Sequence, residues 1–211
     1  MIIKEKVIKY HNVYNISLAE ITRAASTLAE SFKNDPLLQW FFFDDKNYRK
    51  HATTILKTWV KYCVLYGIAL RSENFECVAI RRLPGDATFS LWKVLRSGML
   101  KTRLFMGNEG FLRLQQFEQA VEQATSEHFS DQEYLYCWMI GTRPQYQHQG
   151  FGSAIMEETF RQAETLGVNC YLEVSSHASM ILHREKGYDE IYKIELSDSN
   201  ITVTGMLRQH I

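Results

Sequence analysis

The sequence predicts a mixed α/β fold, in which helices flank a central sheet that includes one parallel pair of strands. The strongest observation is a strand, a helix and a second strand in succession over residues 134–174. A unit of this kind joins its strands by a crossover helix, which makes them parallel. A hairpin pattern over residues 67–83 and helical periodicity on either side of it complete the prediction.

Two helices are expected before the hairpin. Ser17 is followed by Glu20, a capping-box pattern that predicts a helix through about Phe32. The Asn34-Asp35-Pro36 stretch then ends it. A second helix is expected over residues 47–65, and Gly67 stops it. Both helices carry apolar side chains at helical spacing and are expected to supply core.

The hairpin is predicted from two short apolar runs, residues 67–71 and 75–83, separated by a turn-like segment. From residue 87 to about residue 126 the apolar spacing is helical, and Gly98, Gly107 and Gly110 are expected to break this stretch into two helices. The sequence therefore predicts a helical insertion over residues 84–133, between the third and fourth strands.

The strand–helix–strand unit follows the insertion. Residues 134–141 are almost continuously apolar, as expected for a strand covered on both faces. Residues 150–166 predict a helix with Gly167 just beyond its end, and residues 168–174 predict the second strand. A short helix up to Lys186 and two strands, over residues 188–196 and 201–207, are expected to close the chain.

Composition limits the function classes. The 211 residues fit one domain over the whole chain, and 24 Lys and Arg balance 24 Asp and Glu. A net charge of zero provides no global field to recruit nucleic acid or an acidic membrane. The N-terminus lacks the apolar core of a signal peptide, and no uncharged apolar run is long enough to span a bilayer. We therefore expect a soluble, cytoplasmic protein that binds neither nucleic acid nor membrane.

The four cysteines indicate neither a metal site nor a disulfide framework. None of them has the spacing of a metal or redox motif, and all lie in apolar runs: Cys63, Cys77, Cys137 and Cys170. Buried free thiols are expected. His128 and His148 also lack metal-ligand spacing, so no metal is expected.

The segment between the first strand of the parallel pair and its helix predicts an anion site. It contains Gly150 and Gly152, which allow backbone to approach a ligand closely. The unpaired N–H groups of the following helix point to the same place, with the positive end of the helix dipole. A phosphate or pyrophosphate fits such a site. Neither the G-x-G-x-x-G nor the G-x-x-x-x-G-K pattern is present, which argues against a Rossmann or P-loop nucleotide site.

This segment resembles the cofactor loop of the GNAT acetyltransferase family, which follows a strand and has the pattern [Q/R]-x-x-G-x-[G/A]. Gln147, Gly150 and Gly152 occupy those positions, with Pro144 three residues before them. The resemblance implies a GNAT fold with a splayed parallel strand pair, and an acetyl-CoA-binding core over residues 134–195. It implies contacts to the acetyl-CoA pyrophosphate from Gln147, His148, Gln149, Gly150, Phe151, Gly152 and Ser153, and contacts to its pantetheine arm from Ile140, Gly141 and Thr142.

The resemblance continues downstream, where residues 171–174 resemble the family's next strand and residues 184–188 its closing pattern of charges followed by Gly and Tyr. Many relatives place a tyrosine, the proton donor to the cofactor sulfur, four residues before that glycine. Here the position holds His183, and the frequent asparagine four residues earlier is Ser179, which is expected beside the cofactor. Glu173 is the second catalytic candidate, as the group that orients the amine or accepts its proton. Its alternative role is to cap local backbone.

Several other segments keep two interpretations. Glu133, Tyr134 and Tyr136 line the acceptor site or, for the tyrosines, pack in the core. Asp35-Pro36-Leu37 and the aromatic run over residues 40–43 form an acceptor wall, or the aromatics are plain core. His177 caps its helix, touches the cofactor, or is simply exposed.

The charges of the insertion and its role in the protein each allow more than one interpretation. Residues 87–108 contain Lys93, Arg96, Lys101 and Arg103 and no acid, as in a helix that binds a membrane surface or an acidic partner, or in a solvated face. The insertion as a whole contributes to the acceptor side, or forms a homodimer interface or a buttress.

Two functions are compatible with these residues. The first is an N-acetyltransferase that moves an acetyl group from acetyl-CoA directly to a primary amine, without a covalent enzyme intermediate. The second is a GNAT-fold module that binds CoA but no longer turns over, motivated by His183 and Ser179 in place of the usual pair. The amine acceptor is not identified by the sequence, because variable loops form acceptor sites.

Overall fold

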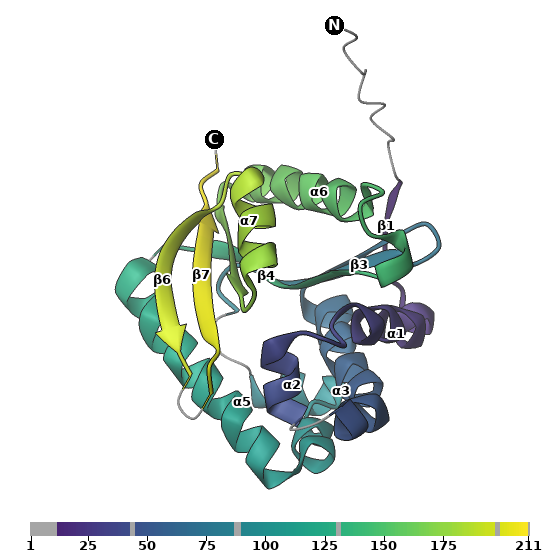
Figure 1. Ribbon diagram of the computed structural model, residues 1–211. Coiled ribbons are helices and arrows are strands. Elements are labelled where there is room, and N and C mark those ends of the chain that lie inside the picture. Colours follow the sequence, from purple (N-terminus) through teal and green to yellow (C-terminus); the bar gives the residue numbers. More distant parts are fainter. Residues whose placement is uncertain (1–11, 43–44, 87–89, 130–131, 197–198, 211) are drawn as a thin grey trace, which may run out of the picture.

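The computed structural model describes residues 12–42, 45–86, 90–129, 132–196 and 199–210 (Figure 1). Within these ranges the predicted helices and strands occur in the predicted order, and the structure adds a short strand, residues 13–15, and a short helix, residues 36–42, that the sequence analysis did not predict. Along the chain the elements are β1 (Val13–Asn15), the 3₁₀ turn η1 (Leu18–Glu20), α1 (Ile21–Ser31), α2 (Pro36–Phe42), α3 (Asp45–Tyr66), β2 (Ile68–Ser72), β3 (Cys77–Arg82), α4 (Leu91–Ser97), α5 (Leu100–Phe129), β4 (Tyr134–Thr142), the 3₁₀ turn η2 (Pro144–Tyr146), α6 (Phe151–Leu166), β5 (Asn169–Val174), α7 (His177–Glu185), β6 (Asp189–Glu195) and β7 (Thr202–Arg208).

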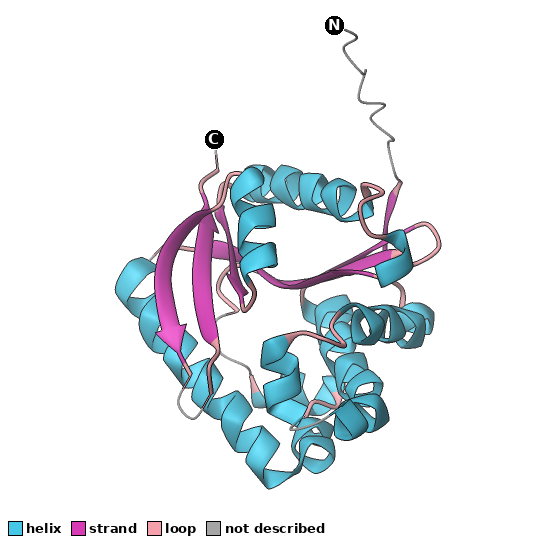
Figure 2. Ribbon diagram, in the orientation of Figure 1, coloured by secondary structure: helices cyan, strands magenta, loops and turns pink. Residues whose placement is uncertain are grey.

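The strands form one sheet in the order β1-β2-β3-β4-β5-β7-β6 (Figure 2). Neighbouring strands are antiparallel except β4 and β5, which are parallel and joined by the crossover helix α6. The predicted mixed sheet with a single parallel pair is therefore confirmed. The helical insertion lies where it was expected, with α4 and α5 between β3 and β4.

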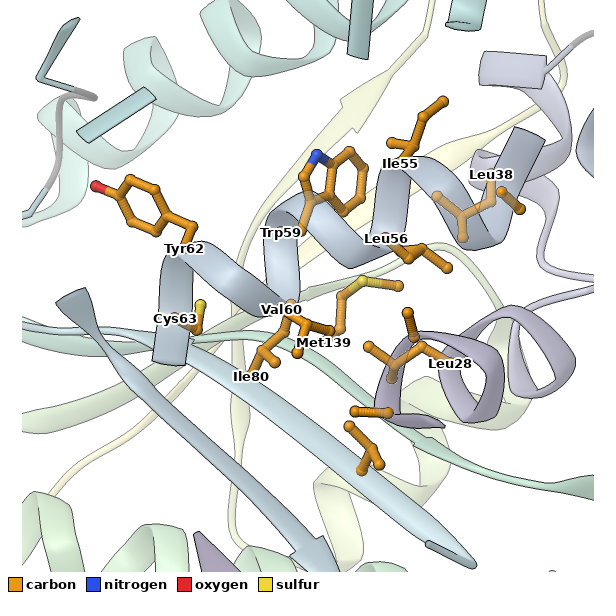
Figure 3. Packing of buried hydrophobic residues seen from close by; sticks show 14 of the residues in the cluster. Leu28, Leu38, Ile55, Leu56, Trp59, Val60, Tyr62, Cys63, Ile80 and Met139 are labelled. Carbon is orange, nitrogen blue, oxygen red and sulfur yellow. The ribbon is translucent and has the colours of Figure 1, made fainter. Parts of the chain in front are cut away.

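Helices cover both faces of the sheet. Helices α6 and α7 lie on one face, whereas α1 and α3 lie on the other, with α2 and α5 packed against them (Figure 1). The main core fills the second layer. Leu28 of α1 and Val60 of α3 point toward Ile80 and Met139 from the strands, and all four are nearly inaccessible to solvent (Figure 3). Burial of this apolar surface provides the main stabilisation of the layer.

The predicted helix boundaries follow from local contacts. The Ser17 N–H donates to the Glu20 carboxylate over 2.9 Å, which confirms the capping box. Helix α3 ends just before Gly67, and a Cβ on that glycine would lie 2.2 Å from the Arg81 carbonyl oxygen. Only glycine allows this helix end to approach the neighbouring strand so closely.

The insertion breaks at two of the three predicted glycines. Gly98 adopts a left-handed conformation (φ 83°) and ends α4, and Gly107 (φ 75°, ψ 173°) kinks α5. The predicted break at Gly110 is wrong, because α5 continues through it. Gly110 instead allows α5 to lie close to α2, because a Cβ there would lie 2.4 Å from the carbonyl oxygen of Phe41.

The four cysteines are free thiols, as predicted, and all but the half-buried Cys137 are fully buried. Within the described ranges, no helix is both long enough and apolar enough to cross a bilayer. The same residues contain no cluster of three or more His, Cys, Asp or Glu side chains that could hold a metal ion.

Candidate functional site

The parallel strands β4 and β5 separate after a short paired stretch. Only Tyr134–Tyr136 of β4 pairs with Asn169–Tyr171 of β5, although both strands continue beyond these residues. The other edge of β4 stays paired with β3 as far as Thr142. Among the described residues, the β5-facing edge of β4 over residues 137–142 thus has no strand partner. Its backbone groups face a gap in which an extended, amide-rich ligand can take the place of a strand.

A β-bulge lies at the closed end of this gap. Met139 pairs with Ile80 and Tyr136 with Arg82, so three steps along β4 match two steps along β3. The extra β4 residue leaves the ladder locally disrupted and re-aims the backbone. Backbone N–H groups that have left the ladder are good donors to a carbonyl oxygen held in the gap.

The glycine-rich loop lies at the open end of the gap, between β4 and α6. His148 (φ 60°) and Gly150 (φ 93°) have positive φ values, which turn the chain sharply into the helix. A Cβ on Gly152 would lie only 3.3 Å from Thr142 Oγ1. The N–H groups of the first turn of α6 have no acceptor inside the helix, so they are available to an anion.

The residues predicted to bind the cofactor come together around this loop and the adjoining strand. The Gln147 side chain donates to the Thr142 carbonyl over 3.3 Å and fixes the loop against the end of β4. Packing against α1 explains why position 141 is a glycine, because a Cβ there would lie 2.7 Å from Ser31 Cβ on that helix.

Helix α7 lies on the α6 side of the sheet and carries the other predicted cofactor contact. Ser176 caps the helix by accepting from the Ser179 N–H over 3.2 Å, and its hydroxyl donates to Ser179 Oγ over 2.9 Å. The suggestion that His177 caps the helix is therefore wrong. His177 is the first residue of α7 and is exposed.

His183 lies one turn after Ser179 and is 5% exposed. Its ring packs against Tyr188 with centroids 5.4 Å apart, and its Nδ1 atom has no hydrogen-bond partner. Burial lowers the pKa of His183 to about 4, so the imidazole is neutral at physiological pH. The predicted acid position thus holds a neutral ring with one N–H to donate.

His183 lines a small cavity between the sheet and the helices of that face. The residues that line it are Ala79, Arg81, Cys137, Met139, Ile140, Met156, Thr159, Leu172, His183 and Tyr188. This set includes the first β4 residue beyond the last pair with β5, together with Ile140 of the predicted pantetheine strand. The cavity therefore lies beside the closed end of the gap between the two parallel strands.

Three polar members of this cavity are not predicted by the sequence. Arg81 is 1% exposed; it donates to the Ile155 carbonyl over 3.1 Å, and its Nη1 atom has no partner. No carboxylate in the described part of the chain lies within ion-pairing distance of it. Cys137 Sγ lies 3.8 Å from the Tyr188 hydroxyl. A hydrogen bond from the Cys170 thiol, followed by the charge of Arg81, lowers the pKa of Cys137.

Glu173 lies on the opposite face of the sheet, in a cluster of tyrosines. The Tyr171 hydroxyl donates to its carboxylate and also contacts the Tyr192 hydroxyl. Burial raises the pKa of Glu173, although hydrogen bonds from Tyr136 and Tyr171 oppose the shift. Glu173 thus binds tyrosine hydroxyls and also accepts a hydrogen bond from its own backbone N–H, so both predicted roles stay open. A Cβ on Gly205, which pairs with Glu173, would strike the Tyr192 ring, so this glycine lets the ring lie over the sheet.

A second carboxylate lies at the same end of β5. Ser175, the residue after the strand, donates to Asp35 over 2.8 Å, and Asp35 also caps α2 by accepting from the Leu38 N–H over 2.9 Å. Burial raises the pKa of Asp35. The sequence analysis placed Asp35 at the end of the first helix and in a possible acceptor wall, and it did not predict the contact with Ser175, which joins residues 140 positions apart.

The remaining residues that the sequence analysis proposed for the acceptor site differ in their surroundings. Tyr134 and Tyr136 both make ring contacts with Tyr171. They therefore pack against a neighbouring ring and also lie close to Glu173. Glu133 is exposed. Phe41 and Phe42 are buried core, and Trp40 is half-buried. Phe43, the last residue of the predicted aromatic run, lies outside the described residues.

Comparison with known proteins is consistent with this geometry. A family model described as "Acetyltransferase (GNAT) family" matches residues 107–188, which include β4, the glycine loop, α6, β5 and α7. An uncharacterized N-acetyltransferase of Schizosaccharomyces pombe is 22% identical over 179 residues, covering 82% of this chain and 70% of that protein.

Two solved structures illustrate the shared fold. A Drosophila melanogaster polyamine N-acetyltransferase that forms N-acetylagmatine has a TM-score of 0.64 at 16% identity, covering 95% of this chain and 99% of its own. A putative acetyltransferase of Salmonella typhimurium, solved with its cofactor acetyl-CoA, has a TM-score of 0.58 at 14% identity, covering 96% and 95%. At these identities the likeness concerns the fold.

Proposed function

We propose that this chain is an N-acetyltransferase of the GNAT family, whose model matches residues 107–188, and that it transfers an acetyl group directly from acetyl-CoA to a primary amine of a small molecule or peptide. The observation that carries the proposal is the separation of β4 from β5 after only three residue pairs, next to a glycine loop at the start of α6. An open strand edge and an anion site at its mouth fit the amide-rich arm and the pyrophosphate of acetyl-CoA.

The residues present fit this co-substrate. Loop residues 147–150 are exposed, so a pyrophosphate can reach the N–H groups at the start of α6. The free edge of β4 over residues 137–142 offers backbone donors and acceptors to the pantetheine amides. Acetyl-CoA, when bound, supplies an activated acetyl group as a thioester.

The chain's own residues then provide three functions. The bulge between Tyr136 and Met139 presents backbone N–H groups to the acetyl carbonyl oxygen. Glu173 and Asp35, both with raised pKa values, attract an ammonium ion and can accept its proton, directly or through water. On the other face, the neutral His183 ring hydrogen-bonds the departing sulfur, with water as the proton source.

The two carboxylates also support an amine as the acceptor. An amine reaches the protein as a cation, and two acidic side chains at one end of β5 favour a cation there. A carboxylate whose pKa is raised by burial is a better base than an exposed one. Attracting the ammonium ion and accepting its proton are both steps of the direct transfer that we propose.

The test is release of CoA measured with acetyl-CoA and a panel of primary amines, with each amine omitted in turn as the blank. We expect release that depends on at least one amine. The alternative is a CoA-binding module without turnover, favoured by the absence of a charged or phenolic acid at His183. Tight acetyl-CoA binding in calorimetry, without release on any amine, would establish that alternative and contradict the enzyme.

A further inference from the structure

Helix α4 exposes three of its large apolar side chains and turns two of its polar ones toward the protein. Leu91, Trp92 and Leu95 are exposed to solvent. The side chains that face the protein include Ser97, which is 2% exposed, and Lys93, whose Nζ lies 2.6 Å from the Asp86 carboxylate. An ordinary surface helix has the reverse arrangement. Packing against the described part of the chain therefore does not explain the exposed apolar side chains of α4.

The first turn of α5 continues this surface. Leu100 and Leu104 are exposed one helical turn apart, only a few residues after α4 ends. We call these side chains the Leu–Trp surface; it consists of Leu91, Trp92, Leu95, Leu100 and Leu104. Each of the five is between 49% and 76% exposed. Five large apolar side chains exposed within fourteen consecutive positions form a cluster of the kind that marks an interaction site.

Positive charge accompanies the Leu–Trp surface. Arg96, Lys101 and Arg103 are exposed and alternate with its leucines, and residues 90–108 contain no acid. Within the described ranges, none of these three cations forms an ion pair with a carboxylate. Because the whole chain has no net charge, this concentration is local. The occupant that complements such a surface is apolar and anionic.

A second copy of the chain does not meet this requirement. A two-fold interface places the same patch on both sides, so that each cation would face its own copies across an apolar contact. Like charges brought together in an interface are strongly unfavourable. The charge pattern thus disfavours a homodimer through the Leu–Trp surface.

We propose that the Leu–Trp surface docks the protein on an anionic lipid bilayer. Side chains exposed to this degree project from the helices and do not line a groove of the kind that receives a partner helix. Leucine and tryptophan insert at the boundary between headgroups and acyl chains, while neighbouring Lys and Arg side chains bind anionic headgroups. This inference reverses the expectation of no membrane binding, which rested on global charge, and it does not depend on the proposed function.

The experiment is flotation of the full chain with two kinds of vesicle, one of phosphatidylcholine alone and one that also contains phosphatidylserine. We expect binding to the anionic vesicles at low salt, weak binding to the neutral ones, and loss of binding in about 1 M salt, where the Debye length is about 3 Å. Binding that is absent at low salt, or equal on both vesicles, would overturn the proposal.

Paired variants separate the two contributions. Trp92→Ser with Leu95→Ser removes apolar insertion, and Arg96→Glu with Lys101→Glu reverses two cations. Each pair should weaken binding to anionic vesicles at least roughly tenfold. The matched control is Leu166→Ser, which changes a leucine of similar exposure on α6, on the other face of the sheet, and should bind as wild type. Equal loss in the control, or none in either pair, would contradict docking through this surface.

Two further results would assign the surface to another occupant. Light scattering that shows a dimer, dissociated by Trp92→Ser with Leu95→Ser, would establish a second copy as the occupant. Binding of an acidic amphipathic peptide to the same surface, without binding to vesicles, would establish a protein partner. Either result overturns the lipid proposal. Circular dichroism of each variant verifies that it is folded.

Discussion

The pKa of the His183 imidazole is lowered because α7 buries the ring against Tyr188. From the family resemblance and its spacing to Gly187, His183 was expected to replace a tyrosine near the cofactor sulfur. The burial and the neighbouring residues support this position, and they also mean that an imidazolium is not the resting state. A neutral imidazole can hydrogen-bond a thiolate through its one N–H, whereas net proton delivery then draws on water.

Replacement of His183 by phenylalanine should separate chemistry from binding. His183→Phe retains a ring of similar size without an N–H, so we expect kcat to fall at least roughly tenfold with little change in acetyl-CoA affinity. His183→Tyr should retain activity, because a phenol is also a donor. Steady-state kinetics over a range of pH measure this, with His177→Phe, an exposed position on the same helix, as the control. A His183→Phe enzyme as fast as wild type at every pH would leave the protein without an assigned acid.

The same pKa shift predicts a pH dependence of stability. Unfolded His183 titrates near pH 6.5, whereas in the fold its pKa is about 4. The unfolded chain therefore gains a proton between these values that the folded chain does not bind, and stability is lost as pH falls. Between about pH 7 and pH 5 the loss is about 2 kcal/mol.

Urea unfolding of wild type and His183→Phe at each pH isolates this contribution. The raised pKa values of Asp35 and Glu173 act in the opposite direction, but they act in both proteins. The wild type should therefore lose more stability on acidification than the variant. Parallel pH profiles for the two proteins would show that the ring is accessible to protons in the folded state.

The buried polar cavity shows why parts of the site were not predicted. Arg81 occupies a strand position that the hairpin pattern predicts correctly, yet nothing in a single sequence shows that its charge is buried without a carboxylate. Cys137 and Tyr188 were predicted only as a core thiol and as part of the closing motif. Their proximity, 3.8 Å between sulfur and hydroxyl, joins residues 51 positions apart. Pairings of this kind depend on tertiary packing, which local patterns do not contain.

At the scale of elements, the sequence predicted the types well and the breaks less well. Hydrophobic periodicity and capping residues located α1, α3, the hairpin and the strand–helix–strand unit. The glycines of the insertion were harder, because the same residue has two uses. Gly98 and Gly107 supply positive φ values, whereas Gly110 allows α5 to contact the backbone at Phe41. Only the packing partner distinguishes these uses.

The first turn of α6 should lose its ligand when Gly152 acquires a branched side chain. Gly152→Val places methyl groups beside Thr142 and over the N–H groups that face the pyrophosphate. Acetyl-CoA affinity should fall at least roughly tenfold, about 1.4 kcal/mol. The control is Glu164→Val, an exposed position near the other end of α6, which carries the same β-branched cost within the helix. Unchanged affinity of a folded Gly152→Val protein in calorimetry would remove the pyrophosphate assignment.

The end of α5 is expected to shape the acceptor side. Phe129 lies with its ring centroid 4.4 Å from that of Tyr134 and 5.2 Å from that of Tyr171, and Tyr171 bonds Glu173. Phe129→Leu should raise KM for the amine at least roughly threefold, about 0.7 kcal/mol, and leave acetyl-CoA affinity unchanged. Phe111→Leu on the same helix is the matched control. Equal KM values for both variants, or a ligand-bound structure with no insertion residue near the acetyl group or acceptor, would contradict this role.

At the scale of the whole molecule, one sheet lies between two layers of helices, and its parallel pair, like the edge pair β1–β2, is joined by only three residue pairs. The sequence predicted this arrangement because the order of elements and the handedness of the crossover leave few alternatives. It did not predict the length of the pairing from physics alone; the splay came from the family resemblance. With only three paired residues between β4 and β5, the sheet is held there mainly by side-chain packing on both faces.

A ligand bound in the gap between β4 and β5 should stabilise the entire chain. Acetyl-CoA bound between β4 and β5 is absent from the unfolded state, so at about 100 times its Kd it adds about 2.7 kcal/mol to the free energy of unfolding. For a chain of this size, that shifts the thermal midpoint by about 5–11 °C. If residues 1–211 form a single domain, as the sequence predicts, the shift occurs in one transition and Gly152→Val abolishes it.

Calorimetric scans with and without acetyl-CoA test this, together with amide hydrogen exchange of residues 137–142, which should slow because their N–H groups gain acceptors from the pantetheine. A scan with two transitions, of which only one moves, would mean that the helical layers unfold separately and that the chain is not one cooperative unit. A single transition that moves while exchange along β4 stays unchanged would place the ligand elsewhere than in the gap. A shifted single transition together with a protected β4 edge is expected only if the ligand binds between β4 and β5 and this strand pair connects the two halves of one cooperative unit.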